Sequence, residues 1–324
     1  MNSTMLGSAA VLGASVLWGT TGTAASLAPT ISALAIGAAA MGIGGLLQAA
    51  LNVDALRRAR PTLMARWAVV LTGGLCVAIY PLAFYSSMRI GGIAVGTAVS
   101  LGSAPLASAV VDRVLDGTRL TRAWIVAAAL GIGGTVLMSS GVHSPGDTSA
   151  AAGVALGLVA GLTYAGYSRS LRDLMSGGIN RGASTGAVFG AGGIALLPIV
   201  VAAAFTSDLS GRPLTVIAYL AIVPMFGGYI LFSHGLARIN AATATTLTLS
   251  EPVFATALAV IFVGERPTTA GWLGVALIMA GLAVLMSSAR PANEPHPRSI
   301  ANRPDVSDRW TSRQPVNGGD RFAN

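Results

Sequence analysis

Residues 84–140 read FYSSMRIGGIAVGTAVSLGSAPLASAVVDRVLDGTRLTRAWIVAAALGIGGTVLMSS, and residues 232–288 read FSHGLARINAATATTLTLSEPVFATALAVIFVGERPTTAGWLGVALIMAGLAVLMSS. The two stretches share landmark residues at a nearly constant offset of 147 to 149 positions. The landmark pairs are Arg89 with Arg238, Pro105 with Pro252, Arg119 with Arg266, and Trp124 with Trp272. Such regular spacing predicts an internal repeat, and this repeat decides the fold.

The composition around the repeat is that of a membrane protein. Of the 324 residues, 53% are hydrophobic and 10% are charged, against roughly 25% charged in an average soluble domain. A bilayer core of about 30 Å needs about 20 mostly apolar residues per helix, and ten segments meet that requirement. Numbered 1 to 10, they span residues 6–26, 30–51, 67–88, 92–111, 123–141, 150–168, 184–205, 214–235, 241–263 and 270–289. We therefore expect an all-α integral membrane protein with ten transmembrane helices.

The repeat divides these helices into two sets of five. Residues 1–141 form the first five-helix repeat, residues 150–289 form the second, and segments 3 to 5 recur as segments 8 to 10. Because five is odd, the second repeat enters the membrane in the opposite direction. In secondary transporters, such inverted repeats place a substrate site near the midplane of the membrane.

The arginines predict the orientation. The net charge of +8 could suggest a nucleic-acid partner, but arginines in short loops collect on the cytoplasmic side of a membrane protein. With both termini inside, seventeen arginines are cytoplasmic and three, Arg89, Arg212 and Arg266, are outside. We predict a multi-pass plasma-membrane protein that binds no nucleic acid. Residues 290–324, rich in Arg and Pro, are expected to form a disordered cytoplasmic tail.

Four motifs resemble those of a known family. They are Trp18-Gly19, the segment LSEPVFA at residues 249–255, Gly264-Glu265-Arg266, and GWLG at residues 271–274. On these motifs the chain resembles an EamA-type member of the drug/metabolite transporter superfamily over about residues 6–289. The first repeat departs from the pattern, with Ala104 opposite Glu251 and Thr118 opposite Glu265. The resemblance implies ten helices, cytoplasmic termini, and transport, often export, of amino acids or other small metabolites without ATP.

Glu251 is the only acidic residue well inside a predicted span. A charged, unpaired carboxylate at that depth costs several kcal/mol, so the side chain should be protonated, paired, or turned toward a wet cavity. Two interpretations stay open: a structural hydrogen bond near Pro252, or coupling of transport to protons. His234, near the end of segment 8, is a second coupling candidate because histidine titrates near neutral pH.

Aromatic and hydroxyl side chains inside the spans are the candidates for a solute cavity. Each one taken singly is also compatible with packing or with the interfacial aromatic belt. The candidates are Trp18, Tyr80, Phe84, Thr97, Ser100, Tyr164, Tyr167, Tyr229, Thr245 and Thr248. A mixture of rings and hydroxyls suits an amphipathic solute of amino-acid size.

Prolines and glycines mark further features of the spans. Pro105 and Pro252 occupy matching repeat positions and are expected to break or kink segments 4 and 9, acting as hinges or gates. Glycines recur every four residues at 153–161 and 182–190, which allows close helix packing. That packing is expected within the chain, with a homodimer as the alternative.

The motifs favour a proton-coupled secondary transporter, most simply an exporter of a small metabolite. The alternatives are a membrane-embedded enzyme or lipid-handling protein that uses Glu251 and His234, and a scaffold that binds through its tail. No nucleotide-binding, nucleophile or metal-site spacing occurs, and Cys76 is the only cysteine. We therefore expect no cofactor, no metal and no catalytic residue.

Overall fold

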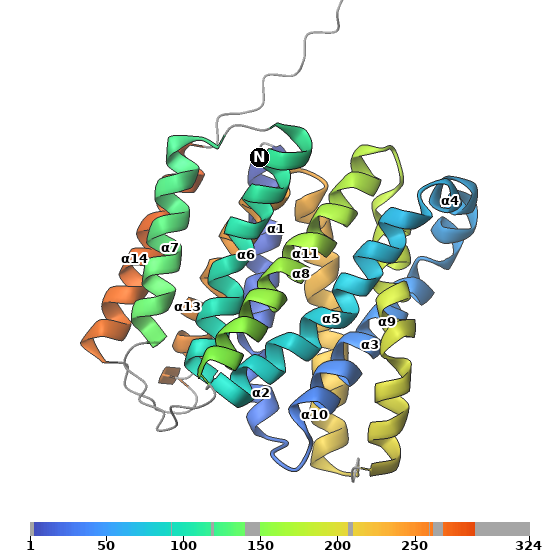
Figure 1. Cartoon of the computed structure of the whole chain (residues 1–324), viewed down its shortest axis with the longest axis horizontal. Coiled ribbons are helices and arrows are strands. Elements are labelled where there is room, and N and C mark those ends of the chain that lie inside the picture. The colour runs from blue at the N-terminus through green and yellow to red at the C-terminus, as the bar shows by residue number, and fades with distance from the viewer. Residues whose placement is uncertain are drawn as a thin grey trace, which may run out of the picture. The chain divides into compact units, whose positions relative to one another are not determined.

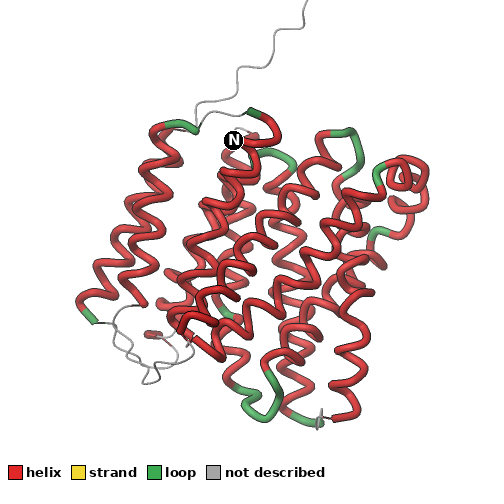
Figure 2. Tube along the Cα trace, viewed as in Figure 1, coloured by secondary structure: helices red, strands yellow, loops and turns green. Residues whose placement is uncertain are grey.

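A computed structural model describes residues 3–91, 93–117, 120–139, 150–206, 210–258, 260–261 and 268–288. Across these ranges all regular structure is helical and no strand occurs (Figure 2). Six helical stretches are long and apolar enough to cross a membrane: Ser3–Ala25, Ala33–Leu51, Trp67–Ile90, Ala151–Ser176, Arg181–Phe205 and Arg212–Leu236. The predicted all-α membrane class is confirmed, and the count of ten spans stays a prediction.

The helices follow the predicted segments with several additional boundaries. In the first half they are α1 (Ser3–Gly19), α2 (Thr21–Ser26), α3 (Ala33–Leu51), α4 (Val53–Ala65), α5 (Trp67–Gly91), α6 (Ile93–Asp116) and α7 (Arg122–Ser139). In the second half they are α8 (Ala150–Ser176), α9 (Arg181–Thr206), α10 (Arg212–Leu220), η1 (Ala221–Gly227), α11 (Gly228–Leu236), α12 (Ala241–Leu247), η2 (Thr248–Ser250), α13 (Glu251–Leu258) and α14 (Thr269–Ser288). The predicted turn at 264–266, Thr118 and the tail 290–324 lie outside the described residues.

Helix α4 lies between predicted segments 2 and 3, where no membrane span was predicted. Its charged residues excluded it from a search for membrane spans, yet the same residues permit an amphipathic surface helix. Asp54 stands in its first turn, where a negative charge suits the helix dipole. Leu63 is buried, and the helix packs against α9.

The helix contacts repeat under exchange of the two halves. Helix α5 of segment 3 packs on α8 of segment 6. In the other half, α11 of segment 8 packs on α1 of segment 1, and these are the equivalent segments. Contacts of α6 with α8 likewise match contacts of α1 with α13. Helices α3 and α9 pack together, and α7 and α14 lie side by side as equivalents (Figure 1). The sequence repeat is therefore also a repeat of tertiary contacts.

Three of the predicted segments are interrupted in their middle or outer part. Segment 1 divides at Thr20, segment 8 contains the π-helical turn η1, and segment 9 contains the 3₁₀ turn η2 directly before Glu251. Helix α6, in contrast, runs without a break past Pro105. Interrupted helices free backbone groups, and at membrane depth these are tolerated only where they face protein or a cavity.

The regularly spaced glycines serve packing inside the chain. A Cβ atom at Gly157 would lie 2.9 Å from Val99, and one at Gly161 would lie 2.9 Å from the carbonyl oxygen of Ser100. On α9, a Cβ at Gly190 would lie 2.8 Å from that of Ala49. Absent side chains at these positions let α8 approach α6 and let α9 approach α3.

Adjacent glycines on α7 provide a test of this packing. Alanine is favoured over glycine in a helix by about 1 kcal/mol, and a Cβ at Gly133 meets nothing within 4 Å. A Cβ at Gly134 would lie 2.6 Å from the carbonyl oxygen of Gly274 on α14, and such overpacking costs about 1–3 kcal/mol. We expect Gly133→Ala to raise the thermal unfolding midpoint of the purified protein and Gly134→Ala to lower it. Equal shifts for both variants would contradict the close α7–α14 contact.

Candidate functional site

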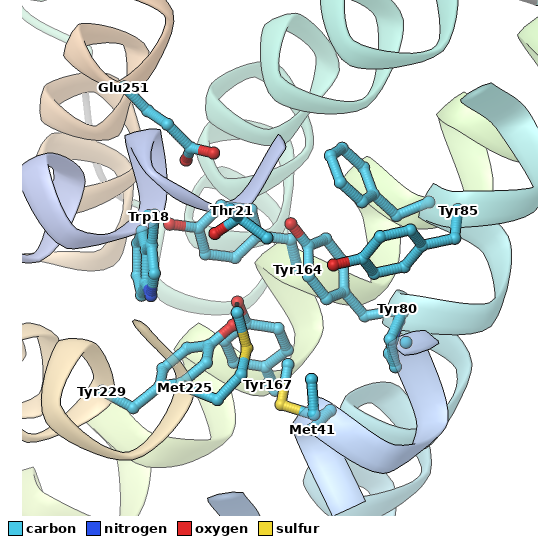
Figure 3. Close-up of a pocket in the computed structure, with 14 residues that line it drawn as sticks. Trp18, Thr21, Met41, Tyr80, Tyr85, Tyr164, Tyr167, Met225, Tyr229 and Glu251 are labelled. Carbon is cyan, nitrogen blue, oxygen red and sulfur yellow. Dashed lines mark hydrogen bonds between the residues drawn. The ribbon is translucent and has the colours of Figure 1, made fainter. Parts of the chain in front are cut away.

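A cavity lies where the three interrupted segments meet α3, α5 and α8 (Figure 3). Its volume is about 30 Å³. Since roughly 10–15 Å³ by that measure holds one water, the cavity has room for about two. The residues that line it are Trp18, Thr21, Gly37, Ala40, Met41, Tyr80, Pro81, Phe84, Tyr85, Tyr164, Tyr167, Met225, Tyr229 and Glu251. In this conformation the lining side chains leave only a small space between them.

Aromatic rings form most of the cavity wall. The ring centroids of Tyr164 and Tyr167 lie 5.1 Å apart in a stacked arrangement, and those of Tyr80 and Tyr164 lie 5.5 Å apart. Trp18 lies 4.9 Å from Tyr229 in a tilted arrangement. The cluster combines α1, α5, α8 and α11, so that rings from both repeats contribute to one wall.

Hydrogen bonds hold the rings in place. The Trp18 indole donates to the carbonyl oxygen of Pro224 at 2.9 Å, a backbone group of the π-helical turn η1. The hydroxyl of Tyr164 donates to Thr248 Oγ1 in the 3₁₀ turn η2 at 3.1 Å, and the hydroxyls of Tyr167 and Tyr229 lie 3.0 Å apart. The helix irregularities thus supply the partners that keep buried indole and phenol groups satisfied.

Among the described residues that line the cavity, Glu251 is the only carboxylic acid, and it begins α13. Its carboxylate points toward Thr21 and Tyr164 in Figure 3. Within the described chain, no hydrogen bond or ion pair engages this carboxylate, and the lining contains no arginine or histidine. The side chain is partly exposed to the cavity, so the carboxylate is available to a bound solute or proton.

Gly19 allows the close approach of two helices that brings Trp18 to this site. A Cβ at Gly19 would lie 3.0 Å from the Cβ of Phe254 and 3.3 Å from the carbonyl oxygen of Glu251. The missing side chain therefore lets α1 approach α13 closely. Trp18 then faces Tyr229 from one side of the cavity while Glu251 reaches it from another (Figure 3).

Seven of the residues singled out from the sequence line the cavity: Trp18, Tyr80, Phe84, Tyr164, Tyr167, Tyr229 and Glu251. Thr248 accepts a hydrogen bond from Tyr164 of the cavity wall, and Thr245 donates to Ser108 Oγ at 3.2 Å. Thr97 donates to the sulfur of Met88 at 3.4 Å, and Ser100 is buried elsewhere on α6. Pro105 lies in α6 and Pro252 in α13, both outside the lining.

His234 also lies outside the cavity lining. It stands in the last turn of α11, where its carbonyl oxygen accepts a hydrogen bond from Arg238 at 2.8 Å. The structure therefore does not bring Glu251 and His234 into one site.

Sequence reasoning missed the part of the lining that comes from α3. Gly37, Ala40 and Met41 carry no charge, ring or hydroxyl, so no chemical signal distinguished them from other packing residues. Thr21 and Tyr85 were also missed, although Tyr85 follows the aromatic Phe84 directly. Their side chains become informative only when the folded chain shows that both face the cavity.

A second hollow, here called the vestibule, opens at the predicted cytoplasmic ends of the helices. Its volume is about 590 Å³, and its lining includes Asp112, Asp116, Arg169, Arg172 and Asp173. This makes it far wider than the central cavity. Along the chain, Thr245 and Thr248 lie between Thr243 of the vestibule lining and Glu251 of the central cavity, and they form hydrogen bonds with Ser108 and Tyr164, respectively.

Arg169 on α8 is the centre of an ion-pair network in the vestibule. Its guanidinium pairs with Asp112 of α6 at 3.1 Å, with Asp116 of α6, and with Asp173 of its own helix at 2.8 Å. The hydrogen bond from Arg169 holds the pKa of the Asp116 carboxyl below its usual range. Arg172, one turn further, donates to the carbonyl oxygens of Leu236 and Ile239 at 2.7 and 2.5 Å. The arginines of α8 thereby tie α6 and the end of α11 together.

Comparison with known proteins gives consistent matches. The profile of the EamA-like transporter family matches residues 5–140 and again residues 151–287. The uncharacterized transporter YwfM of Bacillus subtilis is 34% identical over 86% of this chain and 93% of its own length. A probable terminal-alkyne amino-acid exporter of Streptantibioticus cattleyicolor is 28% identical over 59% of this chain and 63% of its own length. A solved crystal structure superposes with a TM-score of 0.70 at 22% identity, covering 90% of this chain and 99% of that one.

Proposed function

Because the chain belongs to the EamA-like transporter family, we propose that it is a secondary transporter that exports a small amphipathic solute by alternating access. The solute is of amino-acid size and binds in the central cavity. The supporting observation is the position of that cavity, where three interrupted helices from both repeats meet. Transporters built from inverted repeats bind their substrates at such discontinuous helices near the midplane.

The two hollows supply the geometry for alternating access. The central cavity is small, whereas the vestibule is wide, and the hydrogen-bonded residues Thr245 and Thr248 lie along the chain between the two linings. A solute larger than two waters must separate helices in order to enter. Because equivalent contacts join both halves, an exchange of those contacts offers a second conformation that opens the cavity toward the other side.

In the full proposal, ten helices span the plasma membrane with both termini in the cytoplasm. Domain boundaries follow the two repeats, at 1–141 and 150–289. Glu251 carries the coupling proton, since its carboxylate is the only ionisable acid in the lining and has no partner among the described residues. An enzyme that uses Glu251 together with His234 is not favoured, because His234 lies outside the cavity lining.

The deciding experiment identifies a transported solute. Extracellular and intracellular metabolites are compared between cells that overproduce the protein and cells that lack it, and the changed compounds are then assayed with purified protein in liposomes. We expect at least one small amphipathic compound to accumulate outside the overproducing cells and to cross protein-containing liposomes only. If no solute changes in either assay, the export proposal fails.

Trp18 tests whether the central cavity is the transport site. Trp18→Ala removes ring contacts with Tyr229 and Phe232, together with the hydrogen bond to Pro224. We expect the initial transport rate to fall about tenfold, the equivalent of ~1.4 kcal/mol, with an unchanged amount of protein in the membrane. Trp272→Ala, which alters a tryptophan that is 53% exposed, serves as the matched control and should transport normally. Equal rates for both variants would remove Trp18 from the site.

A further inference from the structure

The chemistry of the central cavity narrows the class of solute. We propose that it selects a cationic amine, whose primary ammonium group binds Glu251, Thr21 and Tyr85 against the aromatic wall. This inference rests on the proposed transport function and deepens it. Under this proposal the cavity distinguishes amines from zwitterionic amino acids by their charge, whereas the size of the cavity would admit both.

The first argument is the unbalanced charge of the lining. Glu251 supplies a carboxylate, and none of the lining residues carries a positive charge. No hydrogen bond or ion pair engages that carboxylate within the described ranges. An unpaired carboxyl group away from bulk water favours its protonated form, so a cation that enters this cavity can replace the proton and pair with the carboxylate.

The second argument is a pair of hydroxyl groups without partners. Thr21 Oγ1 and the hydroxyl of Tyr85 are buried, and neither has a hydrogen-bond partner in the described structure. Thr21 and Tyr85 are only 9% and 8% exposed, and both line the cavity. Figure 3 shows the two hydroxyls pointing into the same space as the Glu251 carboxylate. Buried polar groups normally have hydrogen-bond partners, so we infer that a bound ligand supplies the partners of these two oxygens.

The number of acceptors matches one functional group. A primary ammonium has three N–H donors and no acceptor. The carboxylate of Glu251 and the oxygens of Thr21 and Tyr85 provide three acceptor groups on three different helical elements, α13, α2 and α5. One ammonium group would therefore satisfy all of them and draw these elements together.

The aromatic wall suits the same ligand. Trp18, Tyr80, Tyr164 and Tyr229 all line the cavity, and ring faces attract cations that lie within about 6 Å. The rings also offer apolar area for the carbon skeleton of the solute. A carboxylate on the solute would meet the negative ring faces and Glu251 with no arginine or histidine to balance it. Zwitterions and anions should accordingly bind more weakly than the matching amine.

A series of compounds with similar skeletons tests the proposal. The purified full-length protein in nanodiscs is titrated calorimetrically at pH 7 with 3-methylbutylamine, leucine, 4-methylpentanoate and 4-methyl-1-pentanol. These four carry, in order, a cation, a zwitterion, an anion and no charge. We expect the amine to bind at least about tenfold more tightly than leucine or 4-methylpentanoate, as one charge-assisted contact permits. If leucine or 4-methylpentanoate binds as tightly as the amine, the proposal is wrong.

Variants then assign the contact. Glu251→Gln should weaken binding of 3-methylbutylamine about tenfold or more and leave binding of 4-methyl-1-pentanol unchanged. Thr21→Val and Tyr85→Phe should each weaken the amine by a smaller factor. Asp54→Asn, which removes an exposed carboxylate on α4, is the matched control for loss of one negative charge. An unchanged amine affinity in Glu251→Gln would overturn the assignment.

Transport assays distinguish this inference from the proposed function. The same four compounds are tested for counterflow in liposomes that contain the protein. If the amine binds but does not cross the liposome membrane, the preference of the cavity for amines stands, and transport of that ligand through this cavity is contradicted. Movement of leucine with no preference for the amine would retain the transport function and overturn the inference.

Discussion

Glu251→Gln is expected to abolish the response of transport to a pH gradient. A gradient of one pH unit is worth about 1.36 kcal/mol per proton. If each transport cycle moves one proton against one solute, that gradient sustains about tenfold accumulation of the solute. The wild-type protein should reach this ratio, whereas the variant should equilibrate the solute without accumulation.

The physical reason is the position of the carboxylate. Glu251 lies in the cavity wall beside the 3₁₀ turn η2 and close to α1 through Gly19. A proton or a solute that binds there changes the charge in the cavity wall where α1 meets α13, and a change in charge at membrane depth alters which conformation is stable. Glutamine keeps the shape of the side chain but cannot exchange a proton.

The measurement uses liposomes preloaded at one pH and diluted into another, with the solute identified by the metabolite comparison. Glu251→Asp retains a titratable carboxyl group and should retain part of the accumulation, so it controls for the geometric change. Exchange of labelled solute at equal pH reports residual movement that needs no proton. Full gradient-driven accumulation by Glu251→Gln would show that the carboxylate is structural and that protons are coupled elsewhere, if at all.

Arg169→Ala should open the predicted cytoplasmic end of the helix bundle. The Arg169 side chain is 14% exposed and that of its partner Asp112 is 11% exposed, so neither charge is well solvated. Removal of the guanidinium leaves Asp112, Asp116 and Asp173 as uncompensated negative charges around one position. Breaking a buried ion pair costs about 3–5 kcal/mol, which partial exposure reduces here to ~2 kcal/mol.

The loss of these ion pairs destabilises the contact between α6 and α8. Because the network joins these helices, we expect their separation to become about 30-fold more populated in Arg169→Ala. Accessibility is measured as the rate of maleimide labelling of Ser108→Cys, in a background where Cys76 is replaced by serine. Ser108 is buried, accepts a hydrogen bond from Thr245, and lies one helical turn before Asp112 of the network, so its labelling reports the separation of α6 from its neighbours.

Two controls distinguish a specific effect of the Arg169 ion-pair network from general destabilisation of the protein. Arg57→Ala breaks the exposed 3.9 Å pair with Asp54 and should leave labelling unchanged, since exposed pairs contribute little. Adding Asp112→Asn and Asp116→Asn to Arg169→Ala removes most of the unbalanced charge and should restore slow labelling. If Arg169→Ala labels no faster than Arg57→Ala, the network does not hold the two helices together.

The candidate site was partly predictable from sequence because its chemistry is rare within the spans. Glu251 stood out as a lone acid in an apolar segment, and Trp18 or Tyr164 stood out as rings among small residues. Gly37 and Met41 of α3 carried no such signal, since small or apolar side chains occur throughout a membrane helix. Ser100 and Thr97 carry the same hydroxyl signal but lie outside this lining, because a hydroxyl inside a helix can also bond locally or pack elsewhere.

The helix interruptions illustrate the same limit. Pro105 and Pro252 occupy equivalent repeat positions, yet α6 continues past the first while a 3₁₀ turn precedes the second. A proline removes one donor, and the surrounding packing determines whether the backbone compensates. The π-helical turn η1 contains Pro224, whose carbonyl oxygen accepts the Trp18 hydrogen bond from the other repeat. Such a compensating contact depends on a residue 206 positions away.

The sequence by itself determined the membrane class, the repeat and the rare chemical groups, because length, hydropathy and charge are properties of each segment alone. The tertiary structure alone decided which of these groups share one cavity, and that Thr21 and Tyr85 line it beside Glu251 with hydroxyls that have no hydrogen-bond partner in the described part of the chain. The physical reason is that pairing is a relation between segments. A hydroxyl or carboxylate is satisfied or left available only by what the fold places against it.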